Sequence, residues 1–230
     1  MSYEYFDTGN DPRIKFCVSV LQNSIKLLKS KRIGELRRQN FEEQFNTLSQ
    51  FLNPIRYSYL PKKELVGSET FTSLEKNARD LLDKLMENYK NLVKTNEYTI
   101  KWLRFVLRNI LSLKNRLLSY PDKPSSAVEY YFVKILSVIK HPKADKLWLT
   151  SVSDNQEKFD IITNDSSVKV GEIVLLSFLP PRDFSGIVSE GMFLGPNGIR
   201  RGAETDIKKS PTLEPNEEKK IVSMIYEFLK

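Results

Sequence analysis

The chain has 230 residues, of which 40% are hydrophobic and 28% are charged, as in a soluble globular protein of one large or two small domains. Cys17 is its one cysteine and His141 its one histidine, too few for a zinc site built from these side chains. An internal disulfide is likewise excluded, which favours a reducing, cytoplasmic location. The chain has neither a run of roughly 20 apolar residues nor a signal-like N-terminus. We therefore expect no cofactor, no metal and no membrane partner.

The positive charge of the chain is concentrated in its first half. Residues 1–124 hold 22 Lys and Arg against 14 Asp and Glu, a net charge of +8, whereas residues 125–230 have a net charge of −1. A field that attracts a polyanion would therefore arise from the first half.

Before residue 121, apolar residues recur at spacings of three and four, which predicts four amphipathic helices packed as an antiparallel bundle. The first follows Asp11, a favourable N-cap before a proline, and Cys17 lies on its apolar face as a packed thiol. The second should end at Asn53-Pro54, ahead of an irregular segment, and the third should start in a capping box at Thr72. The fourth is apolar on more than one side and should be buried or contact a partner. The expected ranges are 12–31, 34–51, 72–93 and 98–118.

Residues 121–126, with two prolines and two serines, are predicted to link this half to a region of short β-branched and aromatic runs. Five strands within about 70 residues suit a small closed barrel. A last helix, with Ile221, Ile225, Phe228 and Leu229 on its apolar side, should dock onto another surface. The prediction is thus an α+β chain of two domains, a basic helical bundle over 1–124 and a barrel with a C-terminal helix over 125–230. The expected strands are 128–139, 146–153, 158–163, 172–178 and 191–194.

Several motifs follow one another in this second half. Residues 141–147 read His-Pro-Lys-Ala-Asp-Lys-Leu, residues 161–164 read Ile-Ile-Thr-Asn, and residues 186–192 read Gly-Ile-Val-Ser-Glu-Gly-Met. Over residues 127–203 the chain resembles the tRNA-binding domain of stand-alone bacterial tRNA-binding proteins, aminoacyl-tRNA synthetases and endothelial-monocyte-activating polypeptide II. The arrangement of a helical region followed by this domain is similar to that of small stand-alone archaeal proteins. The resemblance implies a five-stranded OB-fold β-barrel that binds tRNA without catalysis.

The resemblance also implies which residues face RNA. It places Ser189 and Met192 on the RNA-facing surface, where a hydroxyl and a thioether suit contacts to sugar, phosphate and base. Asn164 is a further candidate, or it shapes a turn. Strong tRNA binders of the family are rich in Lys and Arg before this segment, but here only Arg182 is basic, so the barrel alone should bind weakly. Phe184 could stack on a base or fill the barrel end.

The other motif residues are explained by barrel construction. Pro142 fixes a turn, and the glycines permit backbone conformations that other residues rarely adopt. Asp145 should accept hydrogen bonds from the backbone amides of its turn. The residues interpreted in this way are His141, Pro142, Asp145, Gly171 and Gly186.

Basic residues of the helical half are expected to supply the missing charge. Lys101, Arg104 and Arg108 fall on one face of the fourth helix, and Lys114 and Arg116 follow. Arg37 and Arg38 belong to a second group at the turn after the first helix. Charge runs of this kind are also common on solvated helix faces that bind nothing. The full second group is Lys26, Lys29, Lys31, Arg32, Arg37 and Arg38.

Three functions are open at this point. The first is a non-catalytic protein, as a homodimer formed through the fourth and C-terminal helices, that recognises tRNA or other structured RNA by shape. The alternative is an interaction module that docks on an aminoacyl-tRNA synthetase and binds RNA weakly itself. An enzyme would need paired carboxylates, a phosphate-cradling glycine loop or a nucleophile–base pair, and we identify none in the sequence.

Overall fold

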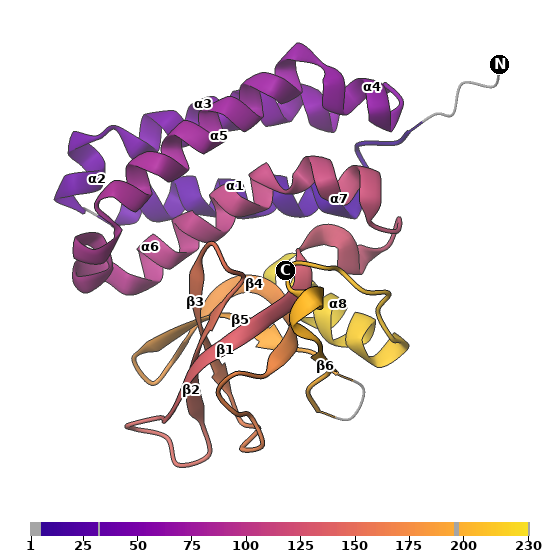
Figure 1. Ribbon diagram of the computed structural model, residues 1–230. Coiled ribbons are helices and arrows are strands. Elements are labelled where there is room, and N and C mark those ends of the chain that lie inside the picture. The colour runs from indigo at the N-terminus through magenta and orange to yellow at the C-terminus, as the bar shows by residue number, and fades with distance from the viewer. Residues whose placement is uncertain (1–5, 32, 196–197, 230) are drawn as a thin grey trace. The chain divides into compact units, whose positions relative to one another are not determined.

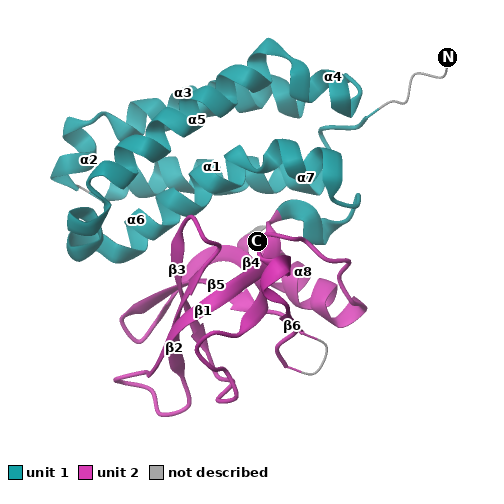
Figure 2. Cartoon of the chain, viewed as in Figure 1, with its two compact units in different colours: residues 1–127, 229 teal, residues 128–228, 230 magenta. Residues whose placement is uncertain are grey.

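The computed structural model describes residues 6–31, 33–195 and 198–229. The chain divides into two compact units, unit 1 over residues 1–127 and unit 2 over residues 128–228 (Figure 2). The division thus lies three residues beyond the boundary expected at residue 124.

Unit 1 is a bundle of helices (Figure 1). Its four long helices form a ring, in which α1 packs against α3 and α6, and α5 packs against the same two helices. This is the arrangement that the helical spacing predicts. The helices are α1 (Pro12–Ser30), α2 (Gly34–Arg38), α3 (Phe41–Arg56), α4 (Lys62–Gly67), α5 (Glu69–Glu87), α6 (Tyr89–Leu111) and α7 (Leu113–Ser119), followed by the 3₁₀ turn η1 (Pro124–Ala127).

Helix α1 forms as its sequence predicts. The carboxylate of Asp11 accepts hydrogen bonds from the backbone N–H groups of Arg13 and Ile14, and a proline occupies the first turn. Cys17 is completely buried, and this burial raises the pKa of its thiol to about 12. The thiol therefore stays protonated, in agreement with its expected role in the core.

The second predicted helix is divided, and its end was predicted wrongly. Asn40 adopts a left-handed conformation with φ 55° and separates α2 from α3. Pro54 lies inside α3, which continues to Arg56. A proline near the end of a helix removes one backbone hydrogen bond, and the burial of Leu52 and Ile55 offsets that loss.

The third and fourth predicted helices also have different bounds. Ser68, not Thr72, caps α5 by accepting a hydrogen bond from the N–H of Phe71. Helix α6 starts before the expected residue 98 but is interrupted at Asn96, whose side chain accepts a hydrogen bond from Thr99 N–H at 3.1 Å. Asn96 therefore caps the second part of α6. Most of that part is buried, as its apolar sequence predicts.

Unit 2 is built on an antiparallel sheet with the strand order β3-β2-β1-β4-β5, and β6 pairs with β4. Its core includes Tyr131 and Phe159, whose rings lie 4.7 and 4.8 Å from that of Phe178. The elements are β1 (Tyr130–Lys140), β2 (Trp148–Ser153), β3 (Lys158–Thr163), β4 (Ile173–Phe184), β5 (Ile187–Phe193), β6 (Arg201–Gly202) and α8 (Pro215–Leu229) (Figure 1).

Strands β4 and β5 are longer than predicted and form a hairpin. Pro180 and Pro181 lie inside β4, where its register with β5 shifts between Phe178 and Arg182. Prolines are accommodated at such irregularities because the ladder hydrogen bonds are already interrupted there. Ser185 and Gly186 form the two-residue turn, both with positive φ, the geometry that joins antiparallel strands tightly.

The expectation of a closed five-stranded barrel needs correction. The sheet has six strands among the described residues, and no hydrogen-bonded ladder between β3 and β5 closes it there. Side chains of β5 bridge these two strands instead: Glu190 accepts a hydrogen bond from Asp160 N–H, and Ser189 accepts one from Ile162 N–H. The edge strands are thus held side by side by side chains rather than by main-chain pairing.

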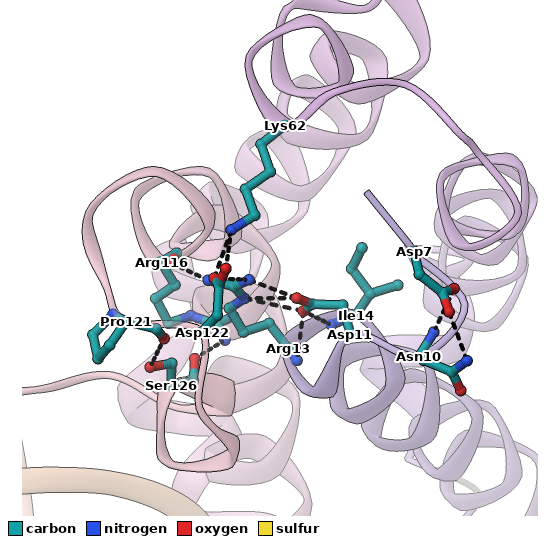
Figure 3. Close-up of polar contacts among 10 residues, drawn as sticks. All are labelled: Asp7, Asn10, Asp11, Arg13, Ile14, Lys62, Arg116, Pro121, Asp122 and Ser126. Atoms are coloured by element: carbon teal, nitrogen blue, oxygen red, sulfur yellow. Dashed lines mark hydrogen bonds and ion pairs between the residues drawn. The ribbon is translucent and has the colours of Figure 1, made fainter. Parts of the chain in front are cut away.

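The segment expected to be a linker is fixed to unit 1. Two buried guanidinium groups hold it (Figure 3). Arg13 forms an ion pair with Asp11 at 2.5 Å and one with Asp122 at 2.7 Å. A hydrogen bond from Lys62, together with one from Arg13 and the positive charges of both side chains, lowers the pKa of the Asp122 carboxyl. Residue 122 is therefore anchored to the bundle.

Arg116 holds the rest of the segment. Its guanidinium donates hydrogen bonds to the carbonyl oxygens of Ser126 and Ala127 at 3.1 and 2.6 Å. The Ser126 hydroxyl donates to the carbonyl oxygen of Pro121 at 2.6 Å (Figure 3). Residues 121–127 are consequently an ordered part of unit 1.

Asp154 holds the β2–β3 turn of unit 2 in a pH-dependent way. Burial acts to raise the pKa of its carboxyl, but hydrogen bonds from the N–H groups of Glu157 and Gln156, with Lys208 and Tyr131, outweigh burial and lower it. A carboxyl whose folded pKa lies below its unfolded value of about 3.9 stabilises the fold fully above that pH. This stabilisation is lost as the pH falls through the folded pKa.

We therefore expect Asp154→Asn to lower the free energy of unfolding at pH 7 by about 1–3 kcal/mol, through the loss of charge-assisted hydrogen bonds. The loss should shrink below pH 4, and urea titrations across pH 2–7 measure it. Asp145→Asn is the matched control, because that carboxylate is fully exposed. Equal losses in both variants at all pH values would contradict this role for Asp154.

Candidate nucleic-acid interface

Unit 2 contains an open pocket of about 450 Å³ beside the β4–β5 hairpin. Its walls come from the end of β3, from β4 and β5, and from α8. The residues selected from the sequence of this unit all line it, although they are far apart in the chain: Asn164, Arg182, Ser189 and Met192.

Ser189 has a structural position in this pocket. It is 3% exposed, its hydroxyl accepts the N–H of Ile162 at 3.0 Å, and it donates to the carbonyl oxygen of Gly191 at 3.0 Å. A hydroxyl with one hydrogen to donate has already used it here. Ser189 therefore holds β3 against β5, and its expected contact with RNA stays a prediction.

Gly191 allows β4 and β5 to approach closely behind the pocket. A Cβ atom at this position would lie 2.4 Å from the carbonyl oxygen of Ser177 on β4. Only glycine fits this spacing without moving one of the strands. The Ser-Glu-Gly-Met motif thus supplies a strand bridge and a close strand contact as well as the half-buried side chain of Met192.

The histidine motif supports the same hairpin. The Nδ1 atom of His141 accepts a hydrogen bond from Lys143 N–H at 3.1 Å, so its Nε2 carries the proton and donates to the carbonyl oxygen of Phe184 at 2.9 Å. The structural interpretation of His141 is thus supported. That of Asp145 needs correction, because its side chain is exposed and lies 3.8 Å from Lys140 rather than on turn amides.

Arg182 and Asn164 are the exposed polar candidates at the pocket. The side chain of Arg182 is 59% exposed and forms a long ion pair, 3.6 Å, with Glu227 of α8. Such an exposed pair is weak and exchanges readily for another anion. Phe184 is half-buried and also lines the pocket, so its ring borders the space that a ligand would fill.

Helix α8 completes the pocket, which the sequence did not predict. Lys220, Met224 and Phe228 line it, and the Lys220 ammonium donates a hydrogen bond to the carbonyl oxygen of Gly195. Ile221 and Ile225 are buried, so this helix is docked, as its apolar residues predict. The side chain of Leu229, also expected on this side of the helix, lies outside the described residues.

The basic residues of unit 1 fall into two classes. Lys101 and Arg104 are buried at 2% and 3% exposure, Arg116 is completely buried, and Arg108 is half-buried. Lys101 pairs with Glu97 at 2.7 Å, and Arg104 lies over the ring of Tyr89. Lys101 and Arg104 thus differ from the exposed cations of the α1–α2 region, and a role of Lys101, Arg104 and Arg108 in RNA binding stays a prediction.

The second group from the sequence remains exposed. We call it the α1–α2 basic cluster, and Arg38 in it is 82% exposed with a 3.7 Å ion pair to Glu35. Arg32, also expected in this group, lies outside the described residues. The exposed members are Lys26, Lys29, Lys31, Arg37 and Arg38.

The described part of the chain holds no group of three or more His, Cys, Asp or Glu side chains placed to bind a metal ion. Among the described helices, none combines the length and apolarity needed to cross a membrane.

Comparison with known families identifies both units. Residues 5–119 match the model of an alpha helical domain family, and residues 131–223 match that of a putative tRNA binding domain. The chain therefore belongs to the alpha helical domain family, whose model covers half of it, and its unit 2 carries a putative tRNA binding domain. This agrees with the resemblance that the motifs carry over residues 127–203.

A particular relative is the phenylalanine–tRNA ligase beta subunit of Leptospira borgpetersenii serovar Hardjo-bovis (strain L550). It is 38% identical to the chain over an alignment of 77 residues, and the match covers 28% of this chain and 10% of that subunit. The chain thus corresponds to about a tenth of the length of this relative.

Proposed function

We propose that this protein is a non-catalytic tRNA-binding protein whose unit 2 contacts RNA at the pocket face. The observation that carries the proposal is the convergence of Asn164, Arg182 and Met192 on one open pocket within the matched domain. Their amide, guanidinium and thioether groups suit base and backbone contacts.

An OB-fold is the architecture we propose for unit 2. The strand order β3-β2-β1-β4-β5, with β3 and β5 held together by Ser189 and Glu190, supports it. Domains of this architecture bind nucleic acids on one side of a curled sheet, where aromatic side chains stack on bases.

The α1–α2 basic cluster is proposed to supply phosphate contacts from unit 1. Among the described residues that line the pocket of unit 2, Arg182 and Lys220 are the cations and Asp165 opposes them, so the net positive charge there is small. Phosphate neutralisation provides most of the sequence-independent affinity for nucleic acids. The buried cations of α6 are not part of this proposal.

The test is an anisotropy titration of labelled, unfractionated tRNA with the full chain at several salt concentrations. We expect Arg37→Ala with Arg38→Ala to reduce the slope of log K against log salt by up to about 2, and Arg182→Ala by about 1. Lys169→Ala, an exposed cation that does not line the pocket, is the control. Absence of tRNA binding even at low salt would refute the proposal.

The second candidate is a cytoplasmic interaction module that docks on an aminoacyl-tRNA synthetase. The modest charge of the pocket face favours it, and the relative found is itself a synthetase subunit. Copurification of a synthetase with a chain that binds little tRNA would support this candidate. A homodimer stays a proposal, which sedimentation at two protein concentrations tests.

A further inference from the structure

The pocket of unit 2 is lined mainly by apolar side chains, which a phosphate-binding site would not need. Aromatic and thioether groups enter it from three elements: Phe184 from β4, Met192 from β5 and Met224 from α8. Its volume of about 450 Å³ falls in the range of sites that take small organic ligands, roughly 300–1,000 Å³. Such a lining favours the binding of a flat, unstacked aromatic group over the binding of a charged group.

Two neighbouring residues at the end of β3 add hydrogen-bonding groups. Asn164 is exposed and offers an amide that both donates and accepts, and Asp165 offers a carboxylate. Hydrogen bonds from the side chain and the N–H of Ser167 lower the pKa of Asp165. The carboxylate therefore stays charged at neutral pH, where it repels phosphate and accepts hydrogen bonds from amino groups.

Cations also border this pocket. Arg182 and Lys220 line it, and Arg182 is largely exposed. A nucleotide presents an apolar base face, an edge with N–H groups and a phosphate, and the pocket offers a partner for each. A simple anion would leave Phe184 and the two thioethers without a role.

We propose that this pocket receives one unpaired nucleobase that carries an amino group, with Phe184 stacking on the base and Asp165 accepting its N–H donors. The inference rests on the proposed tRNA-binding function and deepens it, because recognition by shape alone needs no such pocket. Guanine suits the carboxylate best, since its pairing edge carries adjacent N–H donors. Uracil offers the carboxylate a single ring N–H and no amino group.

The experiment titrates the ¹⁵N-labelled full chain with GMP, AMP, CMP and UMP and follows backbone amide shifts by NMR. We expect GMP to shift the amides of Asn164, Asp165 and Phe184, and UMP to bind at least about fivefold more weakly. Phe184→Leu keeps apolar volume but removes the aromatic face, and should weaken GMP binding roughly five- to 150-fold. Asp165→Asn should abolish the preference for GMP over UMP.

Matched controls separate the pocket from the rest of unit 2. Tyr226→Leu removes an exposed aromatic ring of α8 that does not line the pocket, and Asp183→Asn removes an exposed carboxylate outside it. Neither should change the affinity for GMP. A thermal melt of each variant identifies any loss of folding.

The outcomes distinguish this inference from the proposed function. If tRNA binds the wild type and Phe184→Leu equally while no nucleotide shifts the pocket amides, the inference is overturned and tRNA binding stands. Equal affinity for all four nucleotides would overturn the assignment of an amino-bearing base. If tRNA itself does not bind, the proposed function fails and the inference fails with it.

Discussion

Replacing Arg13 with methionine is expected to lower the free energy of unfolding by about 3–5 kcal/mol, because it leaves a buried carboxylate without its partner. Asp11 is buried beside the Arg13 guanidinium, which also donates to the carbonyl oxygen of Arg116 at 3.0 Å. The variant would break the contact between the start of α1 and residue 122 as well (Figure 3). Urea denaturation followed by helical circular dichroism measures the effect.

Arg38→Met is the matched control for this change. Arg38 also faces a carboxylate in unit 1, but its side chain is 82% exposed and 3.7 Å from Glu35. Exposed pairs contribute at most about 1 kcal/mol, so this variant should unfold nearly as the wild type does. If the two variants lose the same stability, the buried network is not what fixes residues 121–127 to the bundle.

Replacing Gly191 with alanine is expected to destabilise unit 2 by about 3 kcal/mol, at the upper end of the usual cost of overpacking. The added methyl would lie 2.4 Å from a main-chain oxygen of β4, which cannot rotate away as a side chain can. The strands would have to separate where Ser189 joins β5 to β3. The same variant should therefore also lose tRNA affinity.

Alanine substitutions at two other glycines provide the comparison for this result. Gly171 has φ 89° with no atom near its missing Cβ, so alanine there should cost about 1 kcal/mol through backbone strain alone. Gly67 ends α4 with open space around it, and alanine there should be neutral or slightly stabilising. Thermal melts rank the three variants. A Gly191→Ala loss no larger than that of Gly171→Ala would show that close packing of β4 and β5 is unimportant.

Local sequence signals predicted helices and strands correctly where local interactions determine them. Asp11 and its proline mark the start of α1, and strand β3 covers the predicted residues 158–163. The predicted ends of helices and strands were wrong where tertiary packing overrides local preference. Pro54 did not end α3, and the two prolines of β4 mark an irregularity inside the strand rather than its end.

The residues that line the candidate site could be predicted only in part, for a similar reason. Family motifs identified Asn164, Arg182 and Met192, but no local signal indicated that Met224 and Phe228 of α8 would close the same pocket. Helical spacing also cannot tell a solvated cation from one such as Arg116, which is buried because it pairs with distant carbonyl oxygens. Charge along a helix predicts exposure only when no buried acceptor is available.

Ultraviolet cross-linking of bound tRNA to the full chain, with mass spectrometry of the linked peptides, tests most directly where RNA lies. The structure predicts cross-links at Phe184 and Met192, whose side chains line the open pocket of unit 2. It also predicts their loss when Phe184→Leu and Met192→Ala are combined. Cross-links confined to unit 1, with none between residues 179 and 193, would contradict the assignment of the pocket face as the RNA-binding site.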